Sequence, residues 1–507
     1  MQEFSLPLGE SLAACLRRDS RTATNAAGMV ALLNVKPTAA GLHRIEAIAD
    51  PTNSVVSWPF PQLFKGKQVT LLAGANSISQ LDGSWAPTVI SPVDYKQPGT
   101  AYALAGSTSG WQFVDCFGTW VLLNGVDMIF STGERALYGL EAKVFGQRAI
   151  TIGTGCHFQG RLIFAGFNPV NYWSAEWQAF WSEWSTKIAS GFSLPTVMQS
   201  NFVTWSTVGG EDAFWPLDLD RAQLGLATGA DYGGEKPYLL DVLSRGDSGF
   251  MPLHGQGSIV RVEALANSVM LYGDQAIGAL VPTQISYADH MINTFGYKHL
   301  ANFGVASRTA VGGDSRRHVF VDANGYLWAA MDSEGGPTIE RLGFREFLLP
   351  VVNEAFAISH EPNEDEVWIA TSTVGFVLTA SGLVQCSQRP TSLCADGGPR
   401  ASASPTSFAA MTDRFDMGQR GWKRLTFAGV SSVGLTGLDM RSVSYHDASA
   451  TPHIGSWVPA NTAGTAFLGA SGQAFALAFR GTLGDGAKID DITIRWQASD
   501  QRFVRGI

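Results

Sequence analysis

The chain has 507 residues, of which 56 are glycine, 29 phenylalanine and 15 tryptophan, and only 16% are charged. This composition is typical of a turn-rich, aromatic-rich, all-β protein that is long enough to bury about three-quarters of its unfolded surface. The 35 basic and 44 acidic side chains give a formal charge of −9 without any run of Lys or Arg, which argues against a surface that grips DNA.

The N-terminal segment, residues 1–39, is mixed in character and is predicted to be an arm outside any domain. It lacks the basic start and apolar core of a secretory signal, and no stretch approaches the ~18 apolar residues of a membrane span. Five cysteines are scattered without a CxxC pair, and their odd number favours a reducing compartment. Free thiols are therefore expected, with a pairing of Cys386 and Cys394 as the alternative.

A short unit of two apolar strands joined at a glycine recurs from residue 40 onward. Its clearest copy is TWVLLNGVDMIF from Thr119, where Asn124-Gly125 supplies the positive φ of a tight hairpin turn. The same pattern of two apolar strands and a turn recurs in QVTLLAGANSIS, SVMLYGDQAIGAL, HVFVDANGYLW and, less cleanly, EVWIATSTVGFVL. The turn glycines Gly74, Gly125, Gly273 and Gly325 are separated by 51, 148 and 52 residues, so the period is close to fifty if 148 counts as three intervals.

This period predicts a β-propeller of six or seven blades over residues 40–388, because each hairpin must bury its faces against neighbouring units. Stacked β-sandwiches are the alternative. The stretch Leu81-Asp82-Gly83-Ser84-Trp85 is similar to an aspartate box, but it occurs once and out of register. We therefore do not expect it to stabilise a turn as such boxes do.

One inserted amphipathic helix is predicted between two strand-like stretches, RLIFAG at Arg161 and VTWS at Val203. Its apolar residues follow helical spacing and share one face: Trp177, Phe180, Trp181, Trp184 and Ile188. Such a face must be covered, either by the chain's own propeller, which we favour, or by a neighbouring subunit; a sugar-stacking platform is a third interpretation. The candidate interface residues are Trp177, Phe180, Trp181 and Trp184.

The glycine- and aspartate-rich residues 207–250 are predicted to form long loops on one face of the ring. Asp212, Asp218 and Asp220 raise the question of a cation site. The glycine and terminal glutamate of an EF-hand are missing at the required spacing, so solvated loop carboxylates are the favoured interpretation.

A linker is predicted at residues 389–407, where small and turn residues dominate, and a β-sandwich at residues 408–507. Apolar and polar residues alternate in the second of these segments. Phe475, Leu477 and Phe479 fall on one face, and Ile489, Ile492, Ile494 and Trp496 fall largely on another.

The usual phosphate-binding, zinc and nucleophile-elbow motifs are missing from the sequence. His157 beside Cys156 and His446 beside Asp447 have no third partner in view, and Glu364-Asp365-Glu366 is expected to be a solvent-exposed turn. We therefore predict no catalytic residue, no cofactor-binding residue, no metal site and no enzymatic activity.

Several stretches resemble, in order, the tail hub proteins of short-tailed bacteriophages, called nozzle or packaged-DNA stabilisation proteins. They are RLIFAG with a following proline and YWS, then VTWS, MPLHGQGSIVRVEALANSVMLYGD and GVASRTAVGGDSRRHVFVDANGYLWAA. Near the C-terminus, Phe415-Asp416-Met417-Gly418, Trp422-Lys423, AFALAF and DDITIRW resemble the closing domain of the same proteins. The resemblance does not predict the helix at Trp177.

The resemblance implies a structural protein of the virion tail, assembled in the host cytoplasm as a homo-oligomeric ring, with six copies expected. Such a ring extends the tail, lies below an adaptor ring, contacts fibres or spikes, and lets genome DNA pass without specific binding. Two other functions compete with this one: a carbohydrate-binding or carbohydrate-active propeller, favoured by the tryptophan content, and a scaffold propeller that binds cellular proteins.

Overall fold

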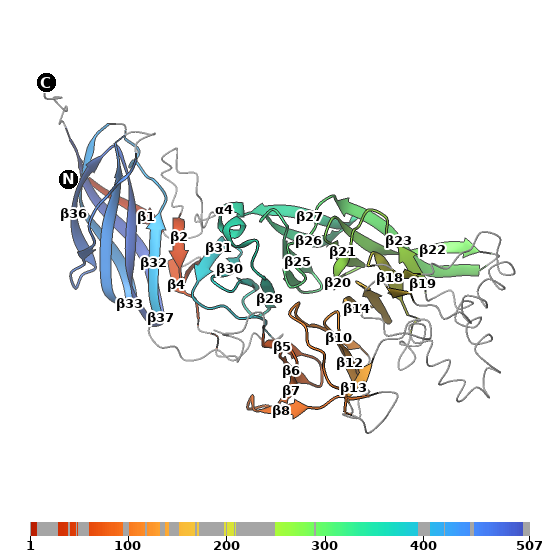
Figure 1. Ribbon diagram of the computed structural model, residues 1–507. Helices are drawn as coiled ribbons and strands as arrows, with labels where there is room; N and C mark the ends of the chain where they lie inside the picture. Colours follow the sequence, from red (N-terminus) through yellow and green to blue (C-terminus); the bar gives the residue numbers. More distant parts are fainter. Residues whose placement is uncertain are drawn as a thin grey trace, which may run out of the picture. The chain divides into compact units, whose positions relative to one another are not determined.

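The computed structural model describes residues 2–7, 29–38, 41–46, 48, 60–94, 101–116, 119–131, 137–140, 152–167, 170–171, 197–198, 200–206, 208, 249–287, 290–393, 406–419, 421–446 and 451–499. The chain forms two compact units (Figure 1). Unit 1 comprises Met1–Ser54, His360–Pro390 and Asp396–Ile507, and unit 2 comprises Val55–Ser359 and Thr391–Ala395. The described secondary structure is almost entirely β, apart from the short helices α4 (Arg345–Leu348) and η2 (Leu349–Val351). None of the described helices has the length and apolar character needed to cross a membrane.

Unit 2 is built from four-stranded antiparallel sheets in which each strand pairs with the next along the chain. Sheet I contains β5 (Gln62–Lys65), β6 (Thr70–Ala73), β7 (Ile78–Leu81) and β8 (Pro87–Ile90). Sheet II contains β10 (Gln112–Cys116), β11 (Thr119–Leu123), β12 (Met128–Ser131) and β13 (Leu137–Leu140), with β9 (Val93–Asp94) parallel to β13. Sheet IV contains β20 (Ile259–Leu265), β21 (Ser268–Gly273), β22 (Ile277–Tyr287) and β23 (His290–Ala301). Sheet V contains β24 (Val311–Gly313), β25 (Arg317–Val321), β26 (Leu327–Ser333) and β27 (Gly336–Gly343).

Sheet III has the same strand order but long connections. Its strands are β14 (Thr154–Phe158), β15 (Arg161–Ala165), β18 (Phe202–Trp205) and β19 (Gly249–Pro252). The middle connection includes a two-stranded ribbon of β16 (Val170–Asn171) and β17 (Val197–Met198). The predicted helix with Trp177, Phe180, Trp181 and Trp184 lies outside the described residues, as do Asp212, Asp218 and Asp220.

The predicted hairpins are confirmed, and each is the middle strand pair of a four-stranded sheet. In the β11–β12 hairpin, Gly125 has φ 87° and the Asn124 side chain accepts a hydrogen bond from the Val126 backbone N–H at 2.8 Å. Among the described residues one sheet, sheet III, lies between the hairpins of Gly125 and Gly273, and it has long connections after β15 and after β18. The 148-residue gap is therefore two intervals lengthened by insertions, and the expectation of three intervals is wrong.

Consecutive sheets pack against each other through buried apolar side chains. Sheets I and II share a core that includes Leu71, Ile78, Trp111, Leu122 and Ile129. Further cores join sheet III to sheet IV and sheet IV to sheet V. The first strand of sheet II contacts the first strand of sheet III, which in turn contacts the first strand of sheet IV. Four-stranded meanders packed in this way form a β-propeller.

The turn between β7 and β8 corrects one expectation. Asp82 Oδ1 accepts hydrogen bonds from the Ser84 backbone N–H at 2.8 Å, the Ser84 hydroxyl at 2.7 Å and the Ala86 N–H at 2.9 Å. The Ser84 side chain, followed by the two backbone bonds, lowers the pKa of the Asp82 carboxyl. Asp82 thus stabilises this turn, although its single occurrence in the sequence argued against such a role.

Unit 1 contains an extended sheet dominated by two long antiparallel strands, β33 (Lys423–Tyr445) and β37 (Ala474–Ala498). The path through the sheet starts with β28 (Ala357–Glu361), which begins in unit 2, followed by β29 (Glu366–Ala370), β30 (Gly375–Thr379) and β31 (Gly382–Cys386). It continues through β2 (Met29–Leu33), β32 (Thr406–Thr412), β37 and β33, and it ends at β34 (His453–Ile454). Strands β28–β31 form sheet VI, which has the same strand order as the sheets of unit 2. Off this path lie β1 (Gln2–Pro7), β3 (Val35–Thr38), β4 (Gly41–Arg44), β35 (Val458–Pro459) and β36 (Thr465–Gly472).

The described residues of the N-terminal segment, 2–7 and 29–38, include strands of this sheet, contrary to the prediction of an arm over residues 1–39. β1 pairs with β37, with Phe4 opposite Ile494, and β2 pairs with β32 and with β31. β1 and β2 are six and five residues long, and their partners lie hundreds of residues away. Local sequence patterns carry no information about such pairings.

The C-terminal apolar residues also differ in arrangement from the expectation of several short strands. Phe475, Phe479 and Ile494 share one strand, because residues 474–498 all belong to β37. The pairing of β37 with β33 shifts register at Ser431/Ser432, Val433/Leu435 and Thr436/Asp439. Bulges of this kind bend a long strand and change which side chains face inward.

The acidic turn at Glu364-Asp365-Glu366 is not simply solvated, which corrects a further expectation. The Glu366 side chain is 2% exposed, and its Oε1 lies 2.5 Å from Lys36 Nζ. Glu364 Oε2 lies 3.3 Å from the same ammonium, and Asp365 lies 3.0 Å from His360 Nε2. Burial acts to lower the pKa of Lys36, but the two carboxylates outweigh it and the pKa is raised.

Candidate functional site

The first strands of the sheets meet at the centre of the propeller, and buried polar side chains join them there. Gln112, on β10, is 1% exposed. Its Nε2 donates to the Val262 carbonyl at 2.7 Å and to Glu263 Oε1 at 3.3 Å, so sheet II is bonded to sheet IV. Its Oε1 accepts from Thr154 Oγ1 at 2.6 Å and from the Gly155 N–H at 3.2 Å in sheet III.

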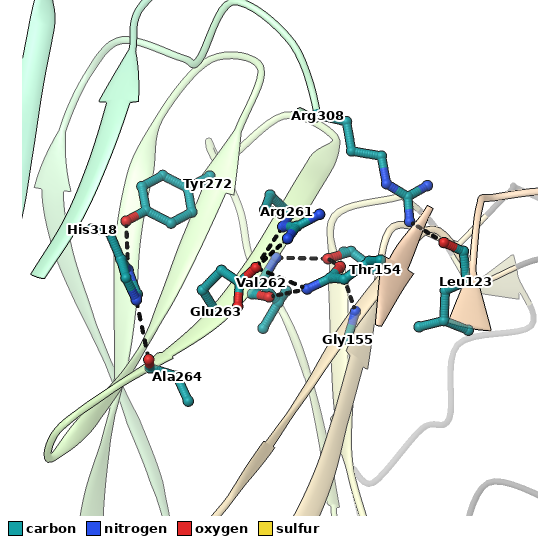
Figure 2. A network of polar contacts seen from close by, with 11 residues as sticks. Leu123, Thr154, Gly155, Arg261, Val262, Glu263, Ala264, Tyr272, Arg308 and His318 are labelled. Atoms are coloured by element: carbon teal, nitrogen blue, oxygen red, sulfur yellow. Dashed lines mark hydrogen bonds and ion pairs between the residues drawn. The ribbon is translucent and has the colours of Figure 1, made fainter. Parts of the chain in front are cut away.

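Thr154 completes the link among these three sheets. Its hydroxyl oxygen also accepts a hydrogen bond from the Val262 backbone N–H at 2.7 Å. Figure 2 shows Thr154 between the strands of sheets III and IV, with Arg261 and Glu263 beside it. Arg261 Nε donates to Glu263 Oε1 at 2.7 Å, so the carboxylate is engaged by a guanidinium and an amide. A buried network of this kind holds its members in one geometry.

A histidine continues the network into sheet V. His318 Nε2 lies 3.1 Å from the Ala264 carbonyl, and its Nδ1 lies 2.9 Å from the Tyr272 hydroxyl (Figure 2). A carbonyl only accepts, so Nε2 carries the proton and Nδ1 accepts from the Tyr272 O–H. Burial lowers the pKa of His318 and raises the pKa of Tyr272, which agrees with this neutral pair.

Further contacts at the centre join sheets I, II and V. Arg308, in the loop before β24, donates from Nη2 to the Leu123 carbonyl at 3.0 Å, as Figure 2 shows. Burial, followed by repulsion from Arg261, lowers the pKa of Arg308 to about 9, so the group remains charged at neutral pH. A Cβ added at Gly110 would lie 2.7 Å from Thr309 Cγ2 and 3.3 Å from Gln62 Oε1. Protein atoms therefore occupy this part of the centre.

A cavity of about 250 Å³ lies beside the network, at the first strands of sheets II, III and IV. Its lining includes Asp115, Cys156, His157, Glu263, Asp314 and His318. Burial raises the pKa of Cys156 well above its ordinary value, so its thiol is protonated and is a poor nucleophile. Burial also lowers the pKa of His157. The cavity can hold small polar molecules, and Glu263 and His318 in its lining are hydrogen-bonded within the network.

Within the described ranges, no group of three or more His, Cys, Asp or Glu side chains is arranged to hold a metal ion. Cys116, Cys156 and Cys386 are free and buried. Cys394, the alternative partner of Cys386, lies outside the described residues. His446 lies near Trp422, with ring centroids 4.9 Å apart.

The sequence-based search missed the central residues Gln112, Thr154, Arg308 and His318. Part of the signal was present, since a polar residue precedes the turn glycine by a near-constant interval in three repeats. Gln62 lies 12 residues before Gly74 and Arg261 lies 12 before Gly273. Gln112 lies 13 before Gly125. An alignment of the repeats on their turn glycines would have placed these residues on the first strands.

No protein-family model matches the chain, and no curated protein matches it. The solved structures to which it is similar include the WD40 domain of Neurospora crassa Pan2, with a TM-score of 0.34, 8% identity, and coverage of 71% of this chain and 88% of that chain. U3-55K has a TM-score of 0.34, 11% identity, and coverage of 69% and 92%. Kluyveromyces lactis Hsv2 has a TM-score of 0.32, 8% identity, and coverage of 69% and 90%. The propeller assignment rests instead on the strand order and the contacts between sheets.

Proposed function

We propose that this chain is a structural virion protein: a tail hub or nozzle subunit that forms a ring, extends the tail of a short-tailed bacteriophage and lines its DNA conduit. In this proposal the propeller has six or seven blades, as the repeat spacing predicts, and the segment with β33 and β37 is the closing β-sandwich. The ring contains six copies, lies against an adaptor ring and carries fibres or spikes. The ordered stretches that resemble such proteins, from RLIFAG to DDITIRW, support this assignment.

The observation that carries the proposal is that polar side chains at the propeller centre are used to join sheets. Gln112 makes four hydrogen bonds to sheets III and IV, and Glu263 is held by Gln112 and Arg261. A rigid, hydrogen-bonded centre suits a subunit that serves as a wall, because its groups are not available to bind and turn over a substrate.

The filled centre also bears on the path of DNA in this proposal. Protein atoms of Gly110, Thr309 and Gln62 meet at the centre, so the conduit is the space enclosed by the ring of copies. Each copy has a formal charge of −9. A wall without net positive charge avoids the salt-dependent grip that phosphate-neutralising surfaces exert on DNA.

The test is to image the purified full chain by negative-stain electron microscopy, alone and with the candidate adaptor ring, and to locate it in intact particles by immunogold labelling. Closed rings and label on the tail are expected. A chain that stays monomeric under both conditions and is absent from the tail would overturn the proposal. If that chain bound host polysaccharide on a glycan array, the carbohydrate-binding alternative would replace it.

A further inference from the structure

Two arginines lie against one tryptophan on the long-strand sheet of unit 1. Asp439 and Arg480 lie opposite each other in the pairing of β33 with β37, and Arg441 lies two residues after Asp439. Side chains that are opposite or two residues apart share one face of a sheet, so these three lie on the same face. Trp457 lies between β34 and β35, which both pair with this part of β33. The Cζ atoms of Arg441 and Arg480 lie 4.4 Å and 4.3 Å from the centroid of the Trp457 ring, so the indole holds two cations close together.

The positive charge of this cluster exceeds its negative charge. The Asp439 carboxylate accepts hydrogen bonds from Nε and Nη2 of Arg480, at 3.2 Å and 3.1 Å. Arg441 is half-buried, and its Nε is shielded from solvent and has no acceptor among the described residues. A partly desolvated guanidinium without an anion is unfavourable, so one further oxyanion beside its terminal nitrogens would complete the cluster. Arg480 is 49% exposed, so a ligand can reach the cluster from solvent.

The surroundings of the cluster favour a carboxylate over the phosphates of a nucleic acid. An arginine fork matches the oxygens of either group. Residues 453–459, which lie along β33 and include Trp457, contain no Asp, Glu, Lys or Arg, and Ile454 among them is 56% exposed. A nucleic acid needs a basic stripe, and this uncharged segment does not extend the two cations into one. A protein segment with a carboxylate next to apolar side chains fits both the cations and their surroundings.

We propose that Arg441 and Arg480, held against Trp457, bind a carboxylate in an acidic segment of a partner protein. The indole keeps the two guanidinium groups in place before the partner arrives, which reduces the entropy that binding costs. Asp439 takes part of the hydrogen-bonding capacity of Arg480. The chain's own carboxylate therefore competes with the incoming one, and its removal should strengthen binding.

The test measures, by fluorescence anisotropy with the full chain, the binding of a labelled peptide in which glutamate alternates with leucine. The same peptide with glutamine in place of glutamate is the reference. The glutamate peptide is expected to bind about tenfold more tightly, because only its carboxylates can pair with the guanidinium groups. Arg441→Gln is expected to remove most of this preference. Arg495→Gln is the matched control, because it removes the same charge from another arginine of β37, which pairs with Glu3, and it should keep the preference.

A variant that gains affinity excludes unfolding as the explanation. Asp439→Asn removes the carboxylate that competes for Arg480, so it is expected to bind the glutamate peptide more tightly than the unaltered chain does. Glu3→Gln frees Arg495 in the same way and is expected to give no such gain. If Arg441→Gln keeps the preference for glutamate, or if Asp439→Asn gains no more than Glu3→Gln, the proposal is wrong.

Inorganic phosphate and glutarate, each added at the same ionic strength, separate the two kinds of oxyanion. Glutarate is expected to displace the glutamate peptide from the unaltered chain more effectively than phosphate does. If phosphate is the better competitor, the cluster prefers phosphate and the acidic segment is the wrong partner. If neither peptide binds, the two arginines serve only to hold Trp457, and the proposal is overturned.

Discussion

Different interactions hold together the propeller sheets of unit 2 and the strands of the long sheet in unit 1. In unit 2, each sheet is a local meander, and neighbouring sheets are joined by apolar cores and by side chains such as Gln112 and Thr154. In unit 1, segments from the beginning, the later part and the end of the chain share one backbone ladder. The difference shows that one chain can use side chains to join repeats and backbone pairing to join distant segments.

The two regions also place charge differently. In unit 1, the buried Glu366 is balanced by Lys36, which lies 330 residues earlier in the chain. In unit 2, most of the central contacts join neutral amides, hydroxyls and backbone groups. Removing one partner therefore leaves a charge in unit 1 and a neutral dipole in unit 2, and the first is the more costly.

The largest expected effect is that of Lys36→Met in unit 1. The Lys36 side chain is 13% exposed and that of Glu366 is 2% exposed, so the substitution leaves a nearly buried carboxylate without its cation. We expect unit 1 to lose about 3–5 kcal/mol of stability. Hydrogen-exchange mass spectrometry in urea would measure the loss in peptides of β2, β29 and β37.

A matched double variant separates the charge from the packing. Lys36→Met with Glu366→Leu removes both charges and is expected to recover most of the stability. If the double variant is as unstable as Lys36→Met, the broken ion pair is not the reason for the loss of stability. The two units would then not differ in the cost of removing one partner of a buried contact.

The second effect in size is that of Gln112→Leu in unit 2. The change removes the donor to the Val262 carbonyl and the acceptor for the Gly155 N–H, and both groups are then buried without this partner. The expected cost is about 1–3 kcal/mol, measured by exchange in peptides of β14 and β20. Gln80→Leu, on the exposed side of β7, is the control and should change stability by less than about 0.5 kcal/mol. Equal losses for both variants would show that the central network is not specially stabilising.

The same contrast explains what could be predicted from sequence. The hairpins at Gly74, Gly125, Gly273 and Gly325 were predictable because turn residues and strand alternation act within about a dozen residues. The pairing of β1 with β37 was not predictable, because six extended residues are compatible with many partners. The ion pair of Lys36 with Glu366 was missed for the same reason.

The candidate site was harder to predict than the hairpins. Gln62, Gln112 and Arg261 precede their turn glycines by 12 or 13 residues, so the first strands carry a polar position that repeat alignment can find. The partners of Gln112 in sheets III and IV depend on how the sheets are arranged around the centre. Local sequence does not specify that arrangement.

A smaller effect is expected when the turn itself is changed by Gly125→Ala. Gly125 has φ 87°, and a Cβ there would lie 3.3 Å from Arg308 Nη1. An L-residue in this region costs about 1–2 kcal/mol, and thermal unfolding of the full chain would measure the change. Gly83→Ala is the control, since a Cβ at Gly83 meets nothing within 4 Å. If the two variants are equally stable, this turn does not constrain sheet II as the structure implies.

The smallest expected effect is a pH dependence of the stability of unit 2, which is caused by His318. Burial lowers the pKa of this imidazole below its ordinary 6.5 and outweighs the hydrogen bond to the Ala264 carbonyl, which raises it. Above pH 6.5 the neutral ring is favoured in both the folded and the unfolded chain. As the pH falls below 6.5, the unfolded chain takes up the proton first, so stability decreases until the pH passes the folded pKa.

The measurement is urea unfolding of the full chain between about pH 7.5 and about pH 5, with exchange in peptides of β21 and β25 as the local probe. His318→Gln keeps a donor and an acceptor and is expected to reduce the slope by up to about 1.4 kcal/mol per pH unit. His254→Gln, which also replaces an imidazole by an amide but at an exposed position, is the matched control. The slope that remains in His318→Gln is expected to include a contribution from His157, because burial also lowers the pKa of that imidazole. An unchanged slope in His318→Gln would mean that the pKa of His318 is the same in the folded and the unfolded chain, and that burial does not favour the neutral ring.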